Sequence, residues 1–410
     1  MLGKRMKSAA VVGGVAVMAL AMATPVGAEQ HVTPSGSGSF SYSQILGSVD
    51  GVTGVRGVST SGPETVLTGT EGNFSGFGST ARPGLTTTAF LYQGVASGVS
   101  KGAPVHLLKP PFADAAQSNF YGPNTHVYNP STIPTGSVRA VGTYGPTLVT
   151  SKGMIYLGPV SGGGSWTSIE VPSRGGFSVV GGTNLCGTDP SCRVLNTVPH
   201  STMGDLVVGN YDLTSSLSTG NAFIYNMTSK KWTLLNLNGS MDAGTTLYGI
   251  WQNGGDHSPN YTLVGGAIDP ATGIAAGVIM NYNEQNGKIS NVTYLNEGNP
   301  ATVTSTTHVE GITTAPGGFM LAAQGAALER VFVPTPGRSG NFGTPVWTQV
   351  AVGSSALCTA SVNGVPTTDQ CSFSSADTVY QGTIMGTYVP PGATLPNTYV
   401  ANPTGTYQNR

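Results

Sequence analysis

Short apolar runs alternate with polar, Gly-rich turns along most of this chain. The stretch 204–237 shows the pattern best: one apolar run ends on Gly209, a second covers 221–226, and a third covers 232–237 with apolar and polar residues alternating. Runs this short, with a period of two, predict β-strands and not helices. The pattern starts again at once, with Gly265 in the place of Gly209.

Four further copies of this unit can be traced with decreasing fidelity. One small residue ends the strand that opens each clear copy, and it serves as a marker for the unit: Gly69, Gly142, Gly209, Gly265, Ala323 and Gly386. The markers are spaced by about 60 residues, which is a repeat period large enough for one supersecondary unit. Four strands in each of six units is the content of a β-propeller with six blades.

The two ends of the repeat array predict how the ring closes. The sixth unit stops after Tyr399-Val400 and lacks a fourth strand, whereas an unassigned strand pattern covers 39–46. We therefore predict an all-β fold, a six-bladed β-propeller of four-stranded blades whose N-terminal strand completes the last blade. An open β-solenoid is the structural alternative, and it would need tighter and more uniform repeats.

The best-preserved units resemble the HAF-repeat extracellular proteins. The likeness is carried by the Gly-Ile of the segment that starts at Leu247, by the Val-Gly-Gly that ends at Gly266, and by Ala-Phe-Ile-Tyr followed by Trp-Thr over 222–233. It is best over 200–300. No copy here has the His that precedes Phe in that group, and the third unit has Val-Pro-His200 in place of Gly-Ile. The resemblance implies a secreted β-propeller and very little about chemistry.

The low charge of the chain disfavours two classes of partner. Only 9% of the residues are charged, and 17 Lys and Arg against 18 Asp and Glu give a net charge of −1. Binding to nucleic acid or to acidic lipid requires a clustered basic face, which so few scattered cations do not provide. We therefore expect no nucleic-acid partner.

The first 28 residues have the pattern of a signal peptide. Lys4, Arg5 and Lys7 precede an apolar run over 9–23, and Val-Gly-Ala28 is a small-residue cleavage pattern. A membrane anchor is the alternative, but the run is short for a bilayer span and no later stretch is long enough. We predict cleavage near Ala28, a single β-propeller domain over 29–410 without a membrane span, and a secreted or cell-surface location.

Four cysteines in an exported chain are expected to form disulfides. Of three formal pairings, the local ones, Cys186 with Cys192 and Cys358 with Cys371, each close a loop that contains turn residues. A zinc site is the alternative, but neither pair has CxxC spacing and no His lies near either pair. We expect no metal and no cofactor.

One set of polar residues is expected at the propeller axis. If the strand that carries Gly-Ile is the innermost of each blade, the residue before its Gly faces the central channel or the packing between sheets. Reading this position across the six units gives Arg56, Tyr121, His200, Tyr248, Glu310 and Gln381. These side chains either converge on a ligand at the channel mouth, where propellers commonly bind, or hydrogen-bond one another in a water-filled tunnel.

Other candidate groups are less specific. His308 lies two residues before Glu310, so the two side chains share a strand face, as an acid/base pair would. Such pairs also occur on solvated strands. Paired carboxylates for sugar hydrolysis can come from different blades, and the candidates are Glu64, Asp205, Asp269 and Glu310. Aromatic residues near loop ends, Trp251 and Tyr261, either stack on sugar rings or pack in the core.

Three functions are compatible with these observations. The first is a secreted or cell-surface binding or interaction module, whose partner is an extracellular glycan or a surface protein. The second is a glycoside hydrolase or lyase at the central channel, with Glu310 or His308 as acid/base and Arg56 holding an anionic group. The third is a structural component of the cell envelope. The residues alone do not decide whether the protein is an enzyme.

Overall fold

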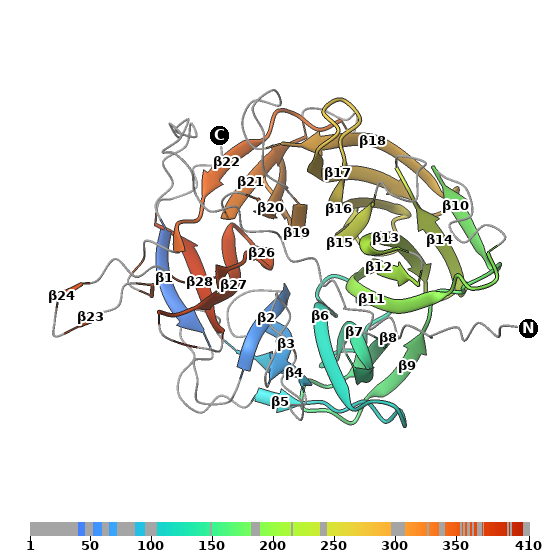
Figure 1. Cartoon of the computed structure of the whole chain (residues 1–410), viewed down its shortest axis with the longest axis horizontal. Helices are drawn as coiled ribbons and strands as arrows, with labels where there is room; N and C mark the ends of the chain where they lie inside the picture. The colour runs from blue at the N-terminus through green and yellow to red at the C-terminus, as the bar shows by residue number, and fades with distance from the viewer. Residues whose placement is uncertain are drawn as a thin grey trace, which may run out of the picture.

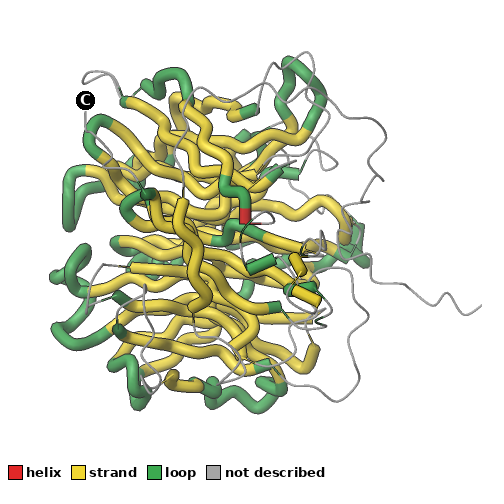
Figure 2. The backbone as a smooth tube through the Cα atoms, turned by 90° about the vertical axis from the view of Figure 1, so that its left-hand side faces the viewer, coloured by secondary structure: helices red, strands yellow, loops and turns green. Residues whose placement is uncertain are grey.

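The structure, a computed structural model, is an all-β ring of six sheets around a common axis (Figure 1). It describes 40–45, 52–59, 65–71, 87–94, 105–147, 150–181, 189–214, 216–237, 244–296, 308–325, 328–335, 341–352, 355, 357–358, 361–362, 365–366, 371, 373–391, 393 and 396–404. Turned by 90°, the strands run between two opposite faces where turns gather (Figure 2). Within the described residues, no helix has the length and hydrophobicity that a membrane crossing needs.

The first three blades are antiparallel sheets whose strands follow in chain order from the axis outward. Blade one is β2 (Val52–Ser59), β3 (Val66–Glu71), β4 (Thr88–Gln93) and β5 (Val105–Leu107). Blade two is β6 (Gln117–Thr125), β7 (Val138–Thr147), β8 (Thr150–Gly158) and β9 (Ser165–Ile169). Blade three is β11 (Val194–Met203), β12 (Leu206–Leu213), β13 (Ser216–Asn226) and β14 (Lys231–Leu235), and β10 (Phe177–Val180) adds a parallel strand outside β14.

The next three blades complete the ring. Blade four is β15 (Thr246–Asn253), β16 (Asn260–Ile268), β17 (Ala275–Asn283) and β18 (Lys288–Leu295). Blade five is β19 (His308–Ala315), β20 (Gly318–Gln324), β21 (Leu328–Pro334) and β22 (Val346–Gln349). Blade six is β25 (Phe373–Ser374) and β26 (Thr378–Tyr380) inside β27 (Thr383–Val389), then β28 (Asn397–Pro403) and β1 (Phe40–Ile45). A small hairpin, β23 (Ser361–Val362) and β24 (Val365–Pro366), stands apart.

The predicted repeat and its closure are confirmed. Every marker residue lies in the second strand of its blade, from Gly69 in β3 to Gly386 in β27. The N-terminal strand β1 pairs antiparallel with β28 from Phe40 opposite Pro403 to Ile45 opposite Thr398, as the blue and red strands of Figure 1 show. The ring is therefore closed by the two ends of the chain.

The core lies between adjacent blades, because each sheet has two apolar faces. Buried side chains of blades three and four form one such cluster, with Leu206, Ile224, Leu263 and Met280 fully or almost fully buried. Both faces of the second strands β12, β16 and β20 are covered, so these strands are buried over almost their whole length and contain few charged residues.

One predicted disulfide is present. Cys358 and Cys371 are bonded, and their loop contains the β23–β24 hairpin. Cys192 is also in a disulfide, but its predicted partner Cys186 lies outside the described residues. Residues 1–39 lie outside them as well, so the signal peptide and the domain start at 29 stay predictions.

Candidate functional site

The innermost strand of each of the first five blades contains an irregularity at the position that the sequence singled out. Pairing of β15 with β16 shifts between Leu247 and Gly249, which leaves Tyr248 as the extra residue of a β-bulge. The same shift leaves Arg56, His200 and Glu310 as extra residues in β2, β11 and β19, and in β6 it falls at Tyr121 and Gly122. A bulge re-aims a side chain, and bulges are frequent beside functional sites.

Marker glycines lie against the bulged inner strand in several blades. At Gly265 an added Cβ would overlap the carbonyl oxygen of Thr246, two residues before Tyr248. The equivalent overlap occurs between Gly142 and Asn119, two residues before Tyr121. In these two blades the glycine of the second strand lets the inner strand approach closely at the bulge, whereas in blade five the bulge of β19 lies beside Ala323.

Four of the predicted residues form a continuous row of rings. The ring centroids are 4.5 Å apart for Tyr121 and His200, 4.6 Å for His200 and Tyr248, and 5.4 Å for Tyr248 and His308. These four residues come from blades two, three, four and five. The inner positions of blades two, three and four thus lie side by side, and His308 of blade five continues the row.

The carboxylate of Glu310 ends the row. Its Oε1 lies 2.9 Å from Nε2 of His308, so the two side chains share a strand face as their spacing predicted. Both are about three-quarters or more buried, with 26% of the His308 side chain and 18% of the Glu310 side chain exposed. A hydrogen bond between a carboxylate and an imidazole in such a place fixes the orientation of both groups.

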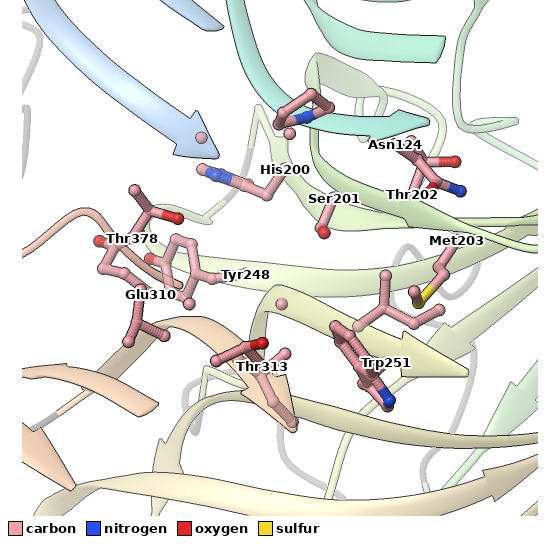
Figure 3. Close-up of a pocket in the computed structure, with 18 of the residues that line it drawn as sticks. Asn124, His200, Ser201, Thr202, Met203, Tyr248, Trp251, Glu310, Thr313 and Thr378 are labelled. Atoms are coloured by element: carbon pink, nitrogen blue, oxygen red, sulfur yellow. The ribbon is translucent and has the colours of Figure 1, made fainter. Parts of the chain in front are cut away.

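A cavity of about 60 Å³ lies at the centre of the ring. All six blades contribute to its wall, and the residues that line it include Gly57, Asn124, Tyr128, His200, Met203, Tyr248, Trp251, Glu310, Thr313, Thr378 and Tyr380. In Figure 3, His200, Tyr248, Glu310 and Thr378 lie together at one side of the cavity, while Trp251 and Met203 lie at the other. The end with His200, Tyr248 and Glu310, which we call the polar end, carries the ionisable groups, whereas the other end combines Met203 and Trp251 with the uncharged Asn124 and Thr202.

The hydroxyl of Tyr248 stays protonated at the polar end. Burial raises the pKa of Tyr248 well above its ordinary value, and the nearby Glu310 carboxylate raises it further, because both disfavour the phenolate. A hydrogen bond with the Thr246 side chain only partly offsets these effects. Tyr248 is therefore a neutral hydroxyl beside a carboxylate across the physiological pH range.

Gln381 does not belong to this set. It lies in the turn between β26 and β27 with φ of 48°, its side chain is exposed, and its Nε2 is 3.3 Å from the Tyr380 hydroxyl. The placement of Gln381 at an inner-strand position was wrong, because Gly382 is a turn glycine with φ of 84° and not the counterpart of Gly311.

Asp377 holds the equivalent position in blade six. Ser374 is opposite Tyr388 and Thr378 is opposite Met385, so the inner segment has one residue more than β27 between these pairs. An added Cβ at Gly386 would overlap the carbonyl oxygen of Ser375, two residues before Asp377.

The remaining candidates have different places. The backbone of Arg56 is at the bulge of β2, but its side chain is outside the described part of the chain, as is Glu64. Asp269 is buried and holds a turn, accepting from Ala271 N at 2.9 Å and from Asn296 Nδ2 at 2.9 Å. Asp205 lies in the turn between β11 and β12.

The two aromatic candidates separate in the structure. Trp251 lines the cavity, whereas Tyr261 is 1% exposed and packs in the core between blades three and four. Among the described residues, no group of three or more His, Cys, Asp or Glu side chains is placed to hold a metal ion.

Comparison with known proteins adds no chemistry. No protein-family model and no curated protein matches the sequence. Solved structures that resemble the chain include a hypothetical protein from Leishmania major (11% identity, 74% of this chain and 93% of that one, TM-score 0.33). A second is a glycosyl hydrolase from Bacteroides ovatus (8% identity, 87% of this chain and 86% of that one, TM-score 0.35). A third is a subtype N10 neuraminidase-like protein of A/little yellow-shouldered bat/Guatemala (10% identity, 88% of this chain and 99% of that one, TM-score 0.34). Likenesses this remote say nothing about the ligand of this chain.

Proposed function

We propose that this protein is a secreted or cell-surface binding module that holds part of a carbohydrate in the central cavity. The observation that carries the proposal is the convergence of His200, Tyr248 and Glu310, from three different blades, on one cavity at the axis. Ligand sites are concave, with a few polar groups that converge among apolar and aromatic walls. The resemblance to the HAF-repeat extracellular proteins supports a location outside the cytoplasm.

The chemistry of the wall suits a neutral, hydroxyl-rich ligand. The Glu310 carboxylate accepts hydrogen bonds, the Tyr248 hydroxyl both donates and accepts, and Trp251 offers a ring face or edge to C–H groups. Sugars present hydroxyl groups and C–H faces in just this combination.

The size of the cavity limits what enters it. A water molecule needs about 10–15 Å³ by the same measure, so 60 Å³ holds about four to six waters. That volume matches a few hydroxyl groups at one edge of a sugar ring and not an oligosaccharide.

The binding test is a glycan array probed with the chain that begins after Ala28. Variants Glu310→Gln and Tyr248→Phe remove hydrogen-bonding capacity at the polar end. Glu310→Gln should weaken binding about tenfold or more, because a hydrogen bond to a charged group contributes about 1.5–3 kcal/mol. Tyr248→Phe should weaken it about two- to tenfold, because a hydrogen bond of a neutral hydroxyl contributes about 0.5–1.5 kcal/mol. Glu170→Gln is the matched control, because Glu170 is an exposed carboxylate outside the cavity. Glycan binding that is absent, or equal in all four proteins, would exclude a site at the axis.

The location rests on the leader and on the disulfide. Disulfides persist in oxidising compartments, and Cys358 with Cys371 forms one here. We expect full-length protein that carries an epitope at its C-terminus to appear in the medium or on the cell surface with its N-terminus at 29. Retention inside the cell with an intact leader would contradict the proposed location.

A second candidate function, hydrolysis or lyase cleavage of a polysaccharide, is favoured by one contact. His308 and Glu310 are hydrogen-bonded at 2.9 Å, as an acid/base group and the residue that orients it would be. Incubation with a panel of polysaccharides separates the two functions: an enzyme releases reducing ends, or unsaturated products with ultraviolet absorbance, and loses this activity in Glu310→Gln. A binding module retains the same polysaccharides unchanged.

A further inference from the structure

The loop of 126–137, which we call the strap, connects β6 to β7 and lies where the innermost strands end. Its own hydrogen bonds make it compact: Asn129 N donates to Thr125 O at 3.2 Å, Ile133 N donates to Asn129 O at 2.9 Å, and the His126 ring contacts Ile133 O at 2.6 Å. Ile133 is 1% exposed. The strap is therefore a structured part of the molecule.

Asn129 fastens the strap to two other blades. It is fully buried, and its Oδ1 accepts from the backbone N of Gly204, directly after β11, at 2.8 Å. Its Nδ2 donates to Oε1 of Gln252 in β15 at 2.7 Å and to Oδ1 of Asp256 at 3.0 Å. One side chain of blade two thus bonds to the ends of the inner strands of blades three and four.

Asp256 strengthens the attachment to blade four. Its Oδ2 accepts from the backbone N of Ser131 at 2.8 Å. Burial alone would raise the pKa of the Asp256 carboxyl, but the hydrogen bonds from Asn129 and Ser131 outweigh it and lower the pKa to about 2. The carboxylate is therefore ionised, and its hydrogen bonds to the strap are charge-assisted.

Tyr128 carries the strap across the axis to blade six. Its hydroxyl donates to the hydroxyl of Tyr380, the last residue of β26, at 2.9 Å. Its ring meets that of Trp251 edge-on, with centroids 5.3 Å apart. Tyr128, Trp251 and Tyr380 all line the cavity, so the strap forms part of its wall. Trp251, which the Tyr128 ring contacts, lies at the end away from His200 and Glu310 (Figure 3).

We propose that the strap closes the channel at the carboxyl ends of the inner strands, so that the cavity is blind and takes only the end of a glycan chain. This inference rests on the proposed carbohydrate binding and specifies its ligand. A chain that passed through the axis would have to break the Tyr128–Tyr380 contact and the four contacts of Asn129 and Ser131 with blades three and four. A chain end enters from the opposite face, places its hydroxyl groups against Glu310 and Tyr248, and stops at Tyr128 and Trp251.

The first test compares chain ends with chain interiors on the unmodified mature protein. A polysaccharide that the glycan array identifies and its partial acid hydrolysate compete, at equal mass concentration, for the protein bound to an immobilised oligosaccharide. A blind cavity predicts that the hydrolysate inhibits better, in proportion to its larger number of ends. Equal inhibition at equal mass would show that internal segments bind and would overturn the blind cavity while leaving carbohydrate binding intact.

The second test alters the floor of the cavity. Tyr128→Ala removes the ring. We expect the binding of chain ends to weaken by up to about tenfold, because this is the contribution of one aromatic contact. We also expect its preference for the hydrolysate over the intact polysaccharide to fall. Tyr128→Phe is the matched control, because it keeps the ring and loses only the hydrogen bond to Tyr380, and its preference should match that of the parent.

The outcomes keep the two proposals apart. If no glycan on the array binds, the carbohydrate function is wrong and the chain-end inference falls with it. If glycans bind but Tyr128→Ala, with an unchanged melting temperature, keeps the parent's affinity and preference, only the strap's role is wrong. If Tyr128→Ala does not fold, the competition on the unmodified protein decides by itself.

Discussion

At the scale of single residues, burial sets the behaviour of several tyrosines. Tyr211, Tyr248 and Tyr399 lie against the cores between blades or the axis, and burial raises the pKa of each phenol above its ordinary value of 10.0. The Tyr211 hydroxyl has no hydrogen-bond partner among the described residues, whereas the Tyr261 hydroxyl accepts from Gln252 at 3.1 Å and donates to Glu284 at 3.2 Å. The same residue type therefore has different energetic roles at the two positions.

We predict opposite outcomes for two Tyr→Phe variants. Tyr211→Phe removes a buried hydroxyl without a partner, so the free energy of unfolding should stay unchanged or rise by up to about 1 kcal/mol. Tyr261→Phe removes both hydrogen bonds of a buried hydroxyl, those with Gln252 and Glu284, and should lower the free energy of unfolding by about 1–3 kcal/mol. Urea unfolding of both variants beside the parent is the measurement. Equal losses would show that Tyr211 has a partner that the contacts do not reveal.

The raised pKa values also predict the alkaline limit of the fold. In the unfolded chain these tyrosines ionise near pH 10, while in the folded protein they must stay protonated. The stability is therefore fully present below pH 10 and falls above it, by up to about 1.4 kcal/mol per pH unit for each such tyrosine. Urea midpoints measured from about pH 8 to about pH 11 test this. Tyr211→Phe should reduce the slope above pH 10, and an unchanged slope would contradict the assignment.

At the scale of the strand, the important feature is a bulge in the inner strand, which lies beside a glycine of the second strand in blade four and beside Ala323 in blade five. The bulge moves Tyr248 out of the regular pairing of β15 with β16, and Gly265 makes room for it. The same arrangement recurs in other blades, so the inner strands present comparable positions to the axis.

We predict that Gly265→Ala is far more damaging than substitution of a turn glycine. The new Cβ would overlap the Thr246 carbonyl, which belongs to the backbone and has little room to move, so the loss should exceed about 3 kcal/mol. Gly273→Ala is the control: its φ is 72° and no atom lies near its Cβ, so only the left-handed backbone costs energy, about 1–2 kcal/mol. Thermal unfolding compares them, and similar losses would mean that β15 can shift freely.

At the scale of the whole molecule, stability depends on closure of the ring. Strand β1 supplies the outer edge of blade six, and Phe40 and Tyr42 pack against the core cluster that contains Tyr399 and Ala401. Without β1, the β28 edge would have unpaired backbone groups, which favours aggregation.

A chain that begins after β1 should therefore be destabilised and aggregation-prone. Complete burial of an aromatic side chain contributes about 1.5–3 kcal/mol, so loss of the partly buried Phe40 and Tyr42 should cost at least about 2 kcal/mol. A synthetic peptide with the β1 sequence should raise the melting temperature of the shortened chain, and the same peptide with Tyr42→Lys should not. A shortened chain that melts like the parent would show that closure contributes little.

The sequence by itself determined the fold and most of the inner positions. Strand periodicity and the spacing of the marker residues are local properties of the chain, and they predicted the six blades and the pairing of β1 with β28. The same repeat singled out Arg56, Tyr121, His200, Tyr248 and Glu310, which the structure places at bulges of the inner strands. The repeat pattern failed in blade six. There Gln381-Gly382 has the same pattern of a polar residue followed by Gly as Glu310-Gly311, but it lies in a turn, and the bulge is at Asp377.

Only the tertiary structure decided how the axis is filled. Tyr128 meets Tyr380 across 252 positions of sequence, and Asn129 meets Gly204 across 75, so no local pattern announces either contact. The strap has the composition of an ordinary polar turn, and its position follows from hydrogen bonds to three other blades. A period in the sequence specifies which strands neighbour each other, whereas the shape of a cavity depends on side chains that meet only after the ring has closed.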